Sequence, residues 1–171
     1  MSNQQRNKKA MFCYGIPIKD DDKETFKQNC KTNINIMSKI AKAKNYEFEV
    51  IPFSELYNGD VSKLDLFYFT GHGNNFCISD CSNTLDTLFD NLNKNKSQKI
   101  IILDACTGKY LQEKTFPENL KVIGGEKIYD SVSLAKLLYD AILCRDKEFR
   151  DLTEHTFKDM SINYSWVKVE N

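Results

Sequence analysis

The hydrophobic and polar residues of the chain follow two periods, one typical of helices and one typical of strands. Apolar residues spaced three and four apart predict a long helix over residues 22–45. The same spacing predicts three later helices, over residues 83–96, 131–144 and, with a weaker stripe, 147–160. Short apolar or alternating runs predict six strands, at residues 9–17, 46–52, 65–71, 98–105, 119–125 and 162–170.

The order of these elements predicts the architecture. Strands that alternate with helices indicate a mainly parallel sheet covered on both faces. The runs at 65–71 and 98–105 are apolar nearly throughout, which is typical of strands buried on both sides. Residues 107–118 are predicted as a loop of ordinary length. We therefore expect an α/β fold, a three-layer α/β/α sandwich with a mainly parallel central sheet.

The length and charge of the chain limit the number of domains and the kinds of partner that we expect. The chain has 171 residues, 41% of them hydrophobic, which suits one domain; we expect it over residues 9–171, after a disordered polar tail at 1–8. The 24 Lys and Arg residues balance 24 Asp and Glu residues, so no net field attracts nucleic acid or an anionic membrane surface. No apolar run is long enough to span a bilayer. We expect neither a nucleic-acid partner nor a membrane partner.

The six cysteines carry information about the compartment. The polar start of the chain has no hydrophobic stretch typical of a secretion signal, and a chain of this size folds without disulfides. Free thiols in a reducing environment are therefore expected, and with them a cytoplasmic location.

One histidine and one cysteine follow the two most apolar strands directly. His72 comes after the strand 65–71, and Cys106 after the strand 98–105. If a right-handed connection through the helix 83–96 makes these strands neighbours, both side chains emerge at the same edge of the sheet. A thiolate beside an imidazole suits attack on an acyl carbon. Cys106 is the predicted nucleophile, and His72 the predicted general acid and base.

The glycines around the histidine fit the same chemistry. Gly71 and Gly73 allow the backbone to turn sharply and to approach a substrate closely. The backbone amides of Gly73 and Cys106 are the predicted oxyanion hole. A cysteine phosphatase would need an arginine shortly after the nucleophile, and CTGKYLQ contains none.

Other interpretations of these residues stay open at this point. Cys106 could be an inert core thiol, and a histidine after a strand is often structural. Cys77 and Cys81, together with His72 and Cys106, would supply four zinc ligands, but structural zinc sites commonly use two close pairs, so we expect no metal. The second histidine, His155, is expected on the surface of a late helix.

Two motifs resemble those of a known group of enzymes. FYFTGHGN followed by IIILDACTG resembles the clan of caspase-like cysteine peptidases, which includes caspases, metacaspases, paracaspases and CHAT-domain proteases. AMFCYGIPIK resembles the opening strand of the clan, and VIGGEKIYDSVSLAKLLYDAIL its late strand and helix. The resemblance covers most of the chain and implies a caspase-like fold. It places the catalytic dyad of a cysteine endopeptidase on His72 and Cys106.

The resemblance is strongest to metacaspase-like and bacterial caspase-like domains, and it extends to substrate recognition. Metacaspases carry an acidic residue two positions before the nucleophile that helps bind a basic P1 side chain, and Asp104 holds that place. Their second acidic position falls on Asn33, within NCKTN. We therefore expect an Arg or Lys preference at P1, with Asp104 and Asn33 binding substrate. Alternatively, Asp104 only hydrogen-bonds a loop or caps a turn.

Further expectations concern regulation and partners. The implied partner is a protein or peptide substrate, and the protein is a monomer, or a homodimer formed through the edge strand 162–170. No cofactor is required; the metacaspase resemblance raises calcium as an activator, although no EF-hand-like loop occurs. Basic specificity would make Lys109 and Lys114 candidate self-cleavage points. The alternative function is an inactive caspase-fold module that regulates a partner.

Overall fold

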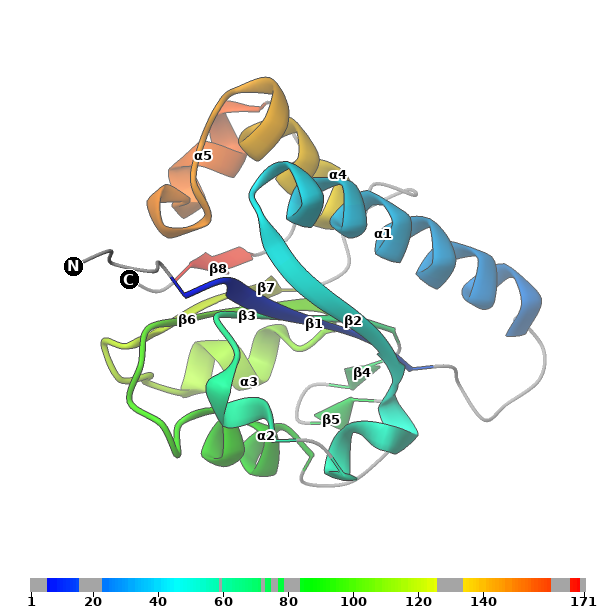
Figure 1. Cartoon of the computed structure of the whole chain (residues 1–171), viewed down its shortest axis with the longest axis vertical. Coiled ribbons are helices and arrows are strands. Elements are labelled where there is room, and N and C mark those ends of the chain that lie inside the picture. Colours follow the sequence, from blue (N-terminus) through cyan, green and yellow to red (C-terminus); the bar gives the residue numbers. More distant parts are fainter. Residues whose placement is uncertain are drawn as a thin grey trace.

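A six-stranded sheet runs through the middle of the molecule (Figure 1). The computed structural model describes residues 6–15, 23–58, 60–71, 73–74, 77–78, 84–125, 134–160 and 167–169. The sheet has the order β2-β1-β3-β6-β7-β8. Its strands are β1 (Lys8–Gly15), β2 (Tyr46–Pro52), β3 (Leu66–Gly71), β6 (Lys99–Cys106), β7 (Leu120–Gly125) and β8 (Val167–Val169). All neighbours pair in parallel except β7 and β8, which are antiparallel.

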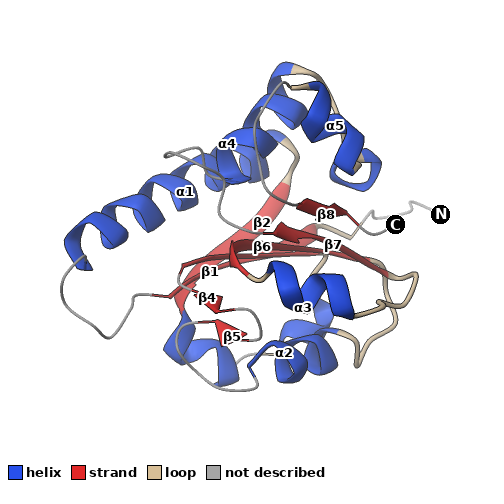
Figure 2. Ribbon diagram, turned by 180° about the vertical axis from the view of Figure 1, so that it is seen from behind, coloured by secondary structure: helices blue, strands red, loops and turns tan. Residues whose placement is uncertain are grey.

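Helices cover both faces of this sheet. The α-helices are α1 (Lys23–Ala43), α2 (Thr84–Leu92), α3 (Gly108–Glu113), α4 (Leu134–Tyr139) and α5 (Glu154–Asp159). Shorter turns are the 3-10 helices η2 (Phe53–Asn58), η3 (Val61–Lys63) and η5 (Phe149–Asp151), and the π-helical η4 (Asp140–Cys144) that continues α4. Helices α1, α4 and α5 lie on one face, and α2 and α3 on the other (Figures 1 and 2). The predicted three-layer sandwich is confirmed.

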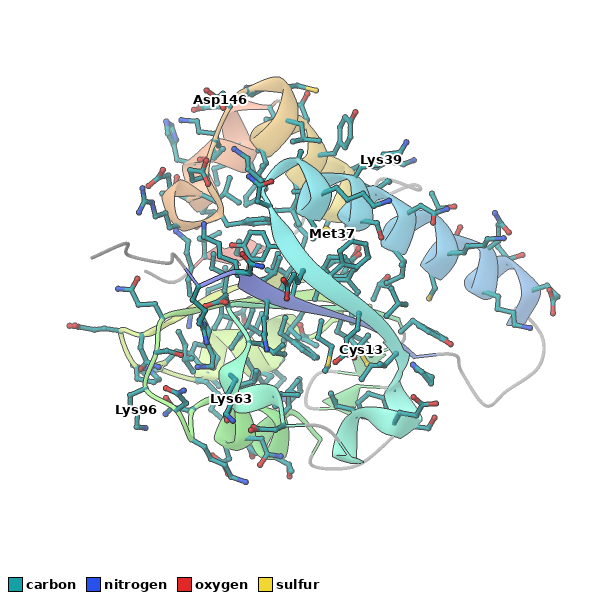
Figure 3. The ribbon with its side chains drawn as sticks, in the orientation of Figure 1. Cys13, Met37, Lys39, Lys63, Lys96 and Asp146 are labelled. Carbon is teal, nitrogen blue, oxygen red and sulfur yellow. The ribbon has the colours of Figure 1, made fainter. Side chains whose placement is uncertain are left out.

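The alternation of side chains along each strand divides the core in two. Successive residues of a strand point to opposite faces, so Tyr68 packs with the α1 and α4 layer while Phe67 and Phe69 pack with the α2 and α3 layer. Met37 of α1 is fully buried and lies between that helix and the sheet (Figure 3). Both central strands are buried on both sides, as their apolar sequences predict.

Several predicted elements differ from the observed ones. The predicted loop 107–118 contains α3, which forms because Tyr110 and Leu111 are buried against the sheet. The predicted helix 83–96 ends at Leu92. The predicted helix 147–160 is split by extended backbone at Leu152, and Thr153 caps a new helix, α5. Within the described part of the chain, no helix has both the length and the apolar character needed to cross a membrane.

The start of the domain also differs from the prediction. Residues 1–8 were expected as a disordered tail, but β1 already begins at Lys8. Arg6 forms an ion pair with Asp65 at 2.8 Å, and the backbone N–H of Lys9 donates to the same carboxylate at 2.8 Å. Residues 6–8 therefore belong to the folded domain, because Asp65 at the start of the neighbouring strand holds them.

Candidate active site

Cys106 is the last residue of β6 and its side chain is exposed. It lies at the carboxyl end of a parallel strand, the edge at which ligands bind in folds of this type. The pairing of β6 with β7 shifts register between Leu103 and Cys106, so the end of β6 leaves the regular ladder. Irregularities of this kind redirect a side chain at the rim of a sheet. The predicted nucleophile is therefore accessible.

The strand that precedes His72 is the direct neighbour of β6, as predicted. Thr70 of β3 pairs with Asp104 of β6, two residues before His72 and Cys106 respectively. His72 itself lies outside the described residues. Gly71 approaches β1 so closely that an added Cβ would lie 2.6 Å from the carbonyl oxygen of Gly15, so no larger residue fits there.

The two residues of the predicted oxyanion hole belong to two different strands. Cys106 ends β6, while Gly73 begins the small strand β4 (Gly73–Asn74). Strand β4 pairs with β5 (Cys77–Ile78) in an antiparallel ladder, with Gly73 opposite Ile78. The role of the Gly73 and Cys106 amides stays a prediction.

A cluster of polar side chains lies under the carboxyl ends of β3 and β6. The hydroxyl of Tyr68 donates to Asp104 Oδ2 at 2.8 Å. The amide of Asn33, on α1, donates to Thr70 Oγ1 at 2.9 Å and to Asp104 Oδ2 at 3.4 Å. The thiol of Cys30 donates to the carbonyl oxygen of Thr70 at 3.7 Å. The fold thus brings Asn33 and Asp104 together, the two predicted substrate-binding residues.

Burial differs sharply within this polar cluster, which comprises Cys30, Asn33, Tyr68, Thr70 and Asp104. Four of the five members are buried, with Tyr68 completely inaccessible, whereas Asp104 is only half-buried. It accepts hydrogen bonds from Tyr68 on a strand and from Asn33 on a helix. Asp104 is therefore the member of the cluster that solvent, or a ligand, can reach.

The electrostatics of the cluster keep its buried acids protonated. Burial, reinforced by the charge of Asp104, raises the pKa of the Tyr68 hydroxyl well above its ordinary value. Burial and the same carboxylate raise the pKa of the Cys30 thiol to about 11. Cys30 is thus a neutral thiol at physiological pH and a poor nucleophile.

The sequence reasoning missed three members of the polar cluster. The sequence pattern places Tyr68 and Thr70 within the apolar run 65–71 and Cys30 within the predicted helix 22–45, without a polar role for any of them. The available signal was the pair of hydroxyl-bearing residues in an otherwise apolar strand, because a buried hydroxyl needs a hydrogen-bond partner. Their partner could not be identified before the strands were aligned.

A hollow borders the buried side of this cluster. It has a volume of about 480 Å³ and lies between α1 and the ends of β1 and β2. Its wall consists of Tyr14, Glu24, Lys27, Gln28, Cys30, Lys31, Ile34, Asn35 and Val50. Cys30 belongs to both the hollow and the cluster, so the two adjoin.

Helix α3 supports the chain just beyond the nucleophile. The ammonium group of Lys168, from β8, donates to the carbonyl oxygens of Leu111 at 2.7 Å and Lys114 at 2.8 Å. It also lies 5.2 Å from the centre of the Phe116 ring. A cation at the carboxyl end of a helix satisfies its terminal carbonyl groups. The last described strand therefore holds the end of α3.

This arrangement bears on the two candidate self-cleavage points. Lys109 lies within α3, and Lys114 follows its last turn. The ammonium group of Lys114 is 3.2 Å from the carboxylate of Asp86, and its carbonyl oxygen accepts from Lys168. Cleavage after either residue therefore requires α3 or its contacts to open first.

The remaining candidate residues are placed as follows. Among the cysteines that the structure describes fully, Cys13 and Cys30 are buried free thiols, and Cys106 and Cys144 exposed ones. Three parts of the zinc alternative, His72, Cys81 and the side chain of Cys77, lie outside the described residues. Within the described part, no three His, Cys, Asp or Glu residues are close enough to hold a metal. His155 is exposed and 3.3 Å from Asp159, which confirms its predicted surface position.

Comparisons with known proteins give a likeness in structure. No family model matches the chain, and no curated protein matches its sequence. The crystal structure of caspase-1 from Spodoptera frugiperda is similar with a TM-score of 0.54 and 15% identity, over 92% of this chain and 77% of that one. The crystal structure of drICE is similar with a TM-score of 0.61 and 10% identity, over 98% and 89%. The protein therefore has the fold of the caspases.

Proposed function

We propose that the protein is a cysteine endopeptidase that hydrolyses peptide bonds after basic residues through a thioester acyl-enzyme. The observation that carries this proposal is the exposed Cys106 at the carboxyl end of β6, beside the strand that leads into His72. The caspase fold supports it, since neighbours with that fold include a caspase. No cofactor is required in this proposal, calcium is a candidate activator, and the cytoplasm is the proposed location.

The proposed reaction uses the two residues in sequence. His72 accepts the proton of the Cys106 thiol, and the resulting thiolate attacks the carbonyl carbon of the scissile bond. The backbone amides of Gly73 and Cys106 stabilise the oxyanion of the tetrahedral intermediate. The imidazolium then protonates the departing amine, which leaves a thioester on Cys106. Water, deprotonated by His72, hydrolyses this thioester and releases the carboxylic acid product.

Asp104 is the proposed determinant of the P1 preference. It lies two residues before the nucleophile and is half-exposed, so its carboxylate can meet a substrate cation near Cys106. Asn33 adds a neutral amide within 3.4 Å of that carboxylate. A lysine or arginine side chain complements a single negative charge of this kind, whereas an aspartate side chain is repelled by it.

Fluorogenic peptides that differ only at P1 test the proposal. We expect the purified protein to cleave peptides with Arg or Lys at P1, and Cys106→Ala and His72→Ala to lose at least about a thousandfold in kcat/KM. Assays with and without calcium show whether the ion activates. Cleavage that persists in Cys106→Ala would exclude this residue as nucleophile.

An inactive caspase-fold module, the alternative function, makes the opposite prediction. An arginyl chloromethyl ketone should then leave Cys106 unmodified, although the exposed thiol of Cys144 still reacts with simple alkylating agents. Selective modification of Cys106 by the ketone supports the peptidase.

A further inference from the structure

The substrate-recognition part of the proposed function rests on Asp104, and the structure points to the residue that orients this carboxylate. We propose that Tyr68 is a positioning residue for P1 specificity: its buried hydroxyl holds the Asp104 carboxylate in place to receive a basic side chain. This inference deepens the proposed function and depends on Asp104 being the P1-binding group.

The first argument is the rigidity of Tyr68. Its side chain is completely buried in the centre of β3. Its ring packs edge-on against Phe12, with centroids 6.0 Å apart and an angle of 88°. Phe12 in turn stacks on Phe48 at 5.1 Å. A tyrosine ring in such packing has little freedom to rotate, so the position of its hydroxyl is fixed by the core.

The second argument is the quality of the hydrogen bond. The Tyr68 hydroxyl lies 2.8 Å from Asp104 Oδ2, within the usual range for hydroxyl donors. Because the pKa of Tyr68 is raised by burial and by the Asp104 charge, the group remains a donor at every physiological pH. Hydrogen bonds to a charged acceptor are stronger than neutral ones, so this bond restrains the carboxylate firmly.

The third argument is the rank of the two donors. Asn33 also donates to Asp104 Oδ2, but at 3.4 Å, and the same amide makes a shorter bond of 2.9 Å to Thr70 Oγ1. The stronger hydrogen bond of the Asn33 amide is therefore the one to Thr70. Of these two donors, Tyr68 restrains the carboxylate more strongly, and both reach the same oxygen from the buried side of the cluster.

The fourth argument is what recognition of a cation requires. A guanidinium group binds a carboxylate best when the two planes are aligned, so a carboxylate free to rotate loses part of this contact. Removal of the Tyr68 hydroxyl should therefore weaken binding of a basic P1 side chain without affecting an uncharged one. A residue that only supported the fold would affect both equally.

Two peptide substrates and one matched control variant test this inference. The substrates carry arginine or norleucine at P1, and the variant is Tyr68→Phe. The control is Tyr110→Phe, which removes another tyrosine hydroxyl bonded to an aspartate, at 2.9 Å from Asp86 on the other face of the sheet. We expect Tyr68→Phe to lower the ratio of kcat/KM for arginine over norleucine about fivefold to tenfold, mainly through KM. Tyr110→Phe should leave the ratio unchanged.

A second variant keeps the inference testable if Tyr68→Phe does not fold. Asn33→Ala removes the weaker donor and should lower the same ratio by only about twofold. A ratio unchanged in Tyr68→Phe, an equal loss on both substrates, or a loss of more than about fivefold in Asn33→Ala, which is measured without any Tyr68 variant, would overturn the inference.

A binding measurement separates this inference from the proposed function. In the Cys106→Ala background, agmatine binding is followed by calorimetry, which needs no turnover. We expect Tyr68→Phe to raise the Kd for agmatine about fivefold to tenfold, and Asp104→Asn to abolish binding. If the wild type cleaves nothing but agmatine binds in this pattern, the peptidase proposal fails, while the positioning of the Asp104 carboxylate by Tyr68 stands as a feature of a cation-binding site. No saturable binding, or equal affinity with and without the Tyr68 hydroxyl, contradicts it.

Discussion

Two tyrosine–aspartate hydrogen bonds lie on opposite faces of the sheet, and their surroundings differ. Tyr68 donates to Asp104 at 2.8 Å and Tyr110 donates to Asp86 at 2.9 Å, so the bonds themselves are alike. Asp86 is exposed and also pairs with the ammonium group of Lys114 at 3.2 Å. Asp104 is half-buried, and the Tyr68 and Asn33 side chains that donate to it carry no charge.

This difference separates a structural contact from a candidate recognition site. The Asp86 charge is already balanced by a lysine of the same chain, and its hydrogen bonds fasten α3 to α2. Tyr68 and Asn33 donate to Asp104 without bringing a positive charge of their own, and in the proposed site this half-buried carboxylate receives the ligand cation.

Within this comparison of the two aspartates, the largest expected effect comes from removing the negative charge of Asp104. Asp104→Asn should reduce kcat/KM for a peptide with arginine at P1 by about a hundredfold, because the substrate cation loses its counter-charge. Asp86→Asn should change it by less than about twofold. Parallel assays of both variants check this. Equal losses in the two variants would show that the two sites do not differ in the way proposed.

The next expected effect concerns Cys106 and Cys144, the two cysteines found exposed among the described residues. A peptidyl arginyl chloromethyl ketone should modify Cys106 at least about tenfold faster than Cys144. Cys106 lies at the edge of the sheet that carries the proposed active site, whereas Cys144 lies at the end of η4. Peptide mapping by mass spectrometry measures both rates in one sample. His72→Ala should bring the Cys106 rate close to that of Cys144, and a rate unaffected by this substitution would exclude His72 as its activating base.

A smaller effect is expected from the contacts around α3. Lys168→Met removes two hydrogen bonds to carbonyl groups at the end of this helix and should lower the free energy of unfolding by about 1–3 kcal/mol. Lys114→Met loses a surface ion pair with Asp86 and a contact 5.4 Å from the centre of the Tyr110 ring, and should cost about 1 kcal/mol or less. Urea unfolding of both variants compares them. A larger loss of unfolding free energy in Lys114→Met than in Lys168→Met would show that the Lys168 contacts do not stabilise the end of α3.

A further expected effect appears at alkaline pH. Burial raises the pKa of Cys13 to about 12 and, together with the Asp104 charge, that of Cys30 to about 11, against an ordinary value of 9.0. Because both are raised, the stability from the neutral thiols is fully present below pH 9 and is lost as the pH rises through 11 and 12. We expect the urea midpoint to fall over this interval.

The two buried thiols also distinguish the faces of the sheet. Asp104→Asn should lower the pKa of Cys30, which this carboxylate raises, and leave that of Cys13 unchanged. NMR titration of the cysteine Cβ signals measures both values. A shift of the two thiols by the same amount would indicate a general change of the fold instead of a local charge effect.

Much of the fold follows from patterns within single segments. The apolar runs at 65–71 and 98–105 appear as the central strands β3 and β6, within a residue of their predicted bounds. Consecutive strands joined through one helix are expected to be neighbours, and the observed pairing places the segment before His72 beside the one before Cys106. The prediction failed where packing outweighs local pattern, as in the short helix α3, whose Tyr110 and Leu111 are buried by distant residues.

For the candidate site, too, some features follow from local sequence patterns and others from the tertiary structure. The sequence by itself determined which residues carry chemistry, because a histidine and a cysteine that directly follow buried strands are visible as local patterns. Only the tertiary structure decided how Asp104 is held, since Tyr68 and Asn33 lie 36 and 71 positions away from it along the chain. Such contacts depend on strand register and on the rotation of α1, which no local pattern encodes. The buried hydroxyl of Tyr68 becomes informative only when its acceptor is known.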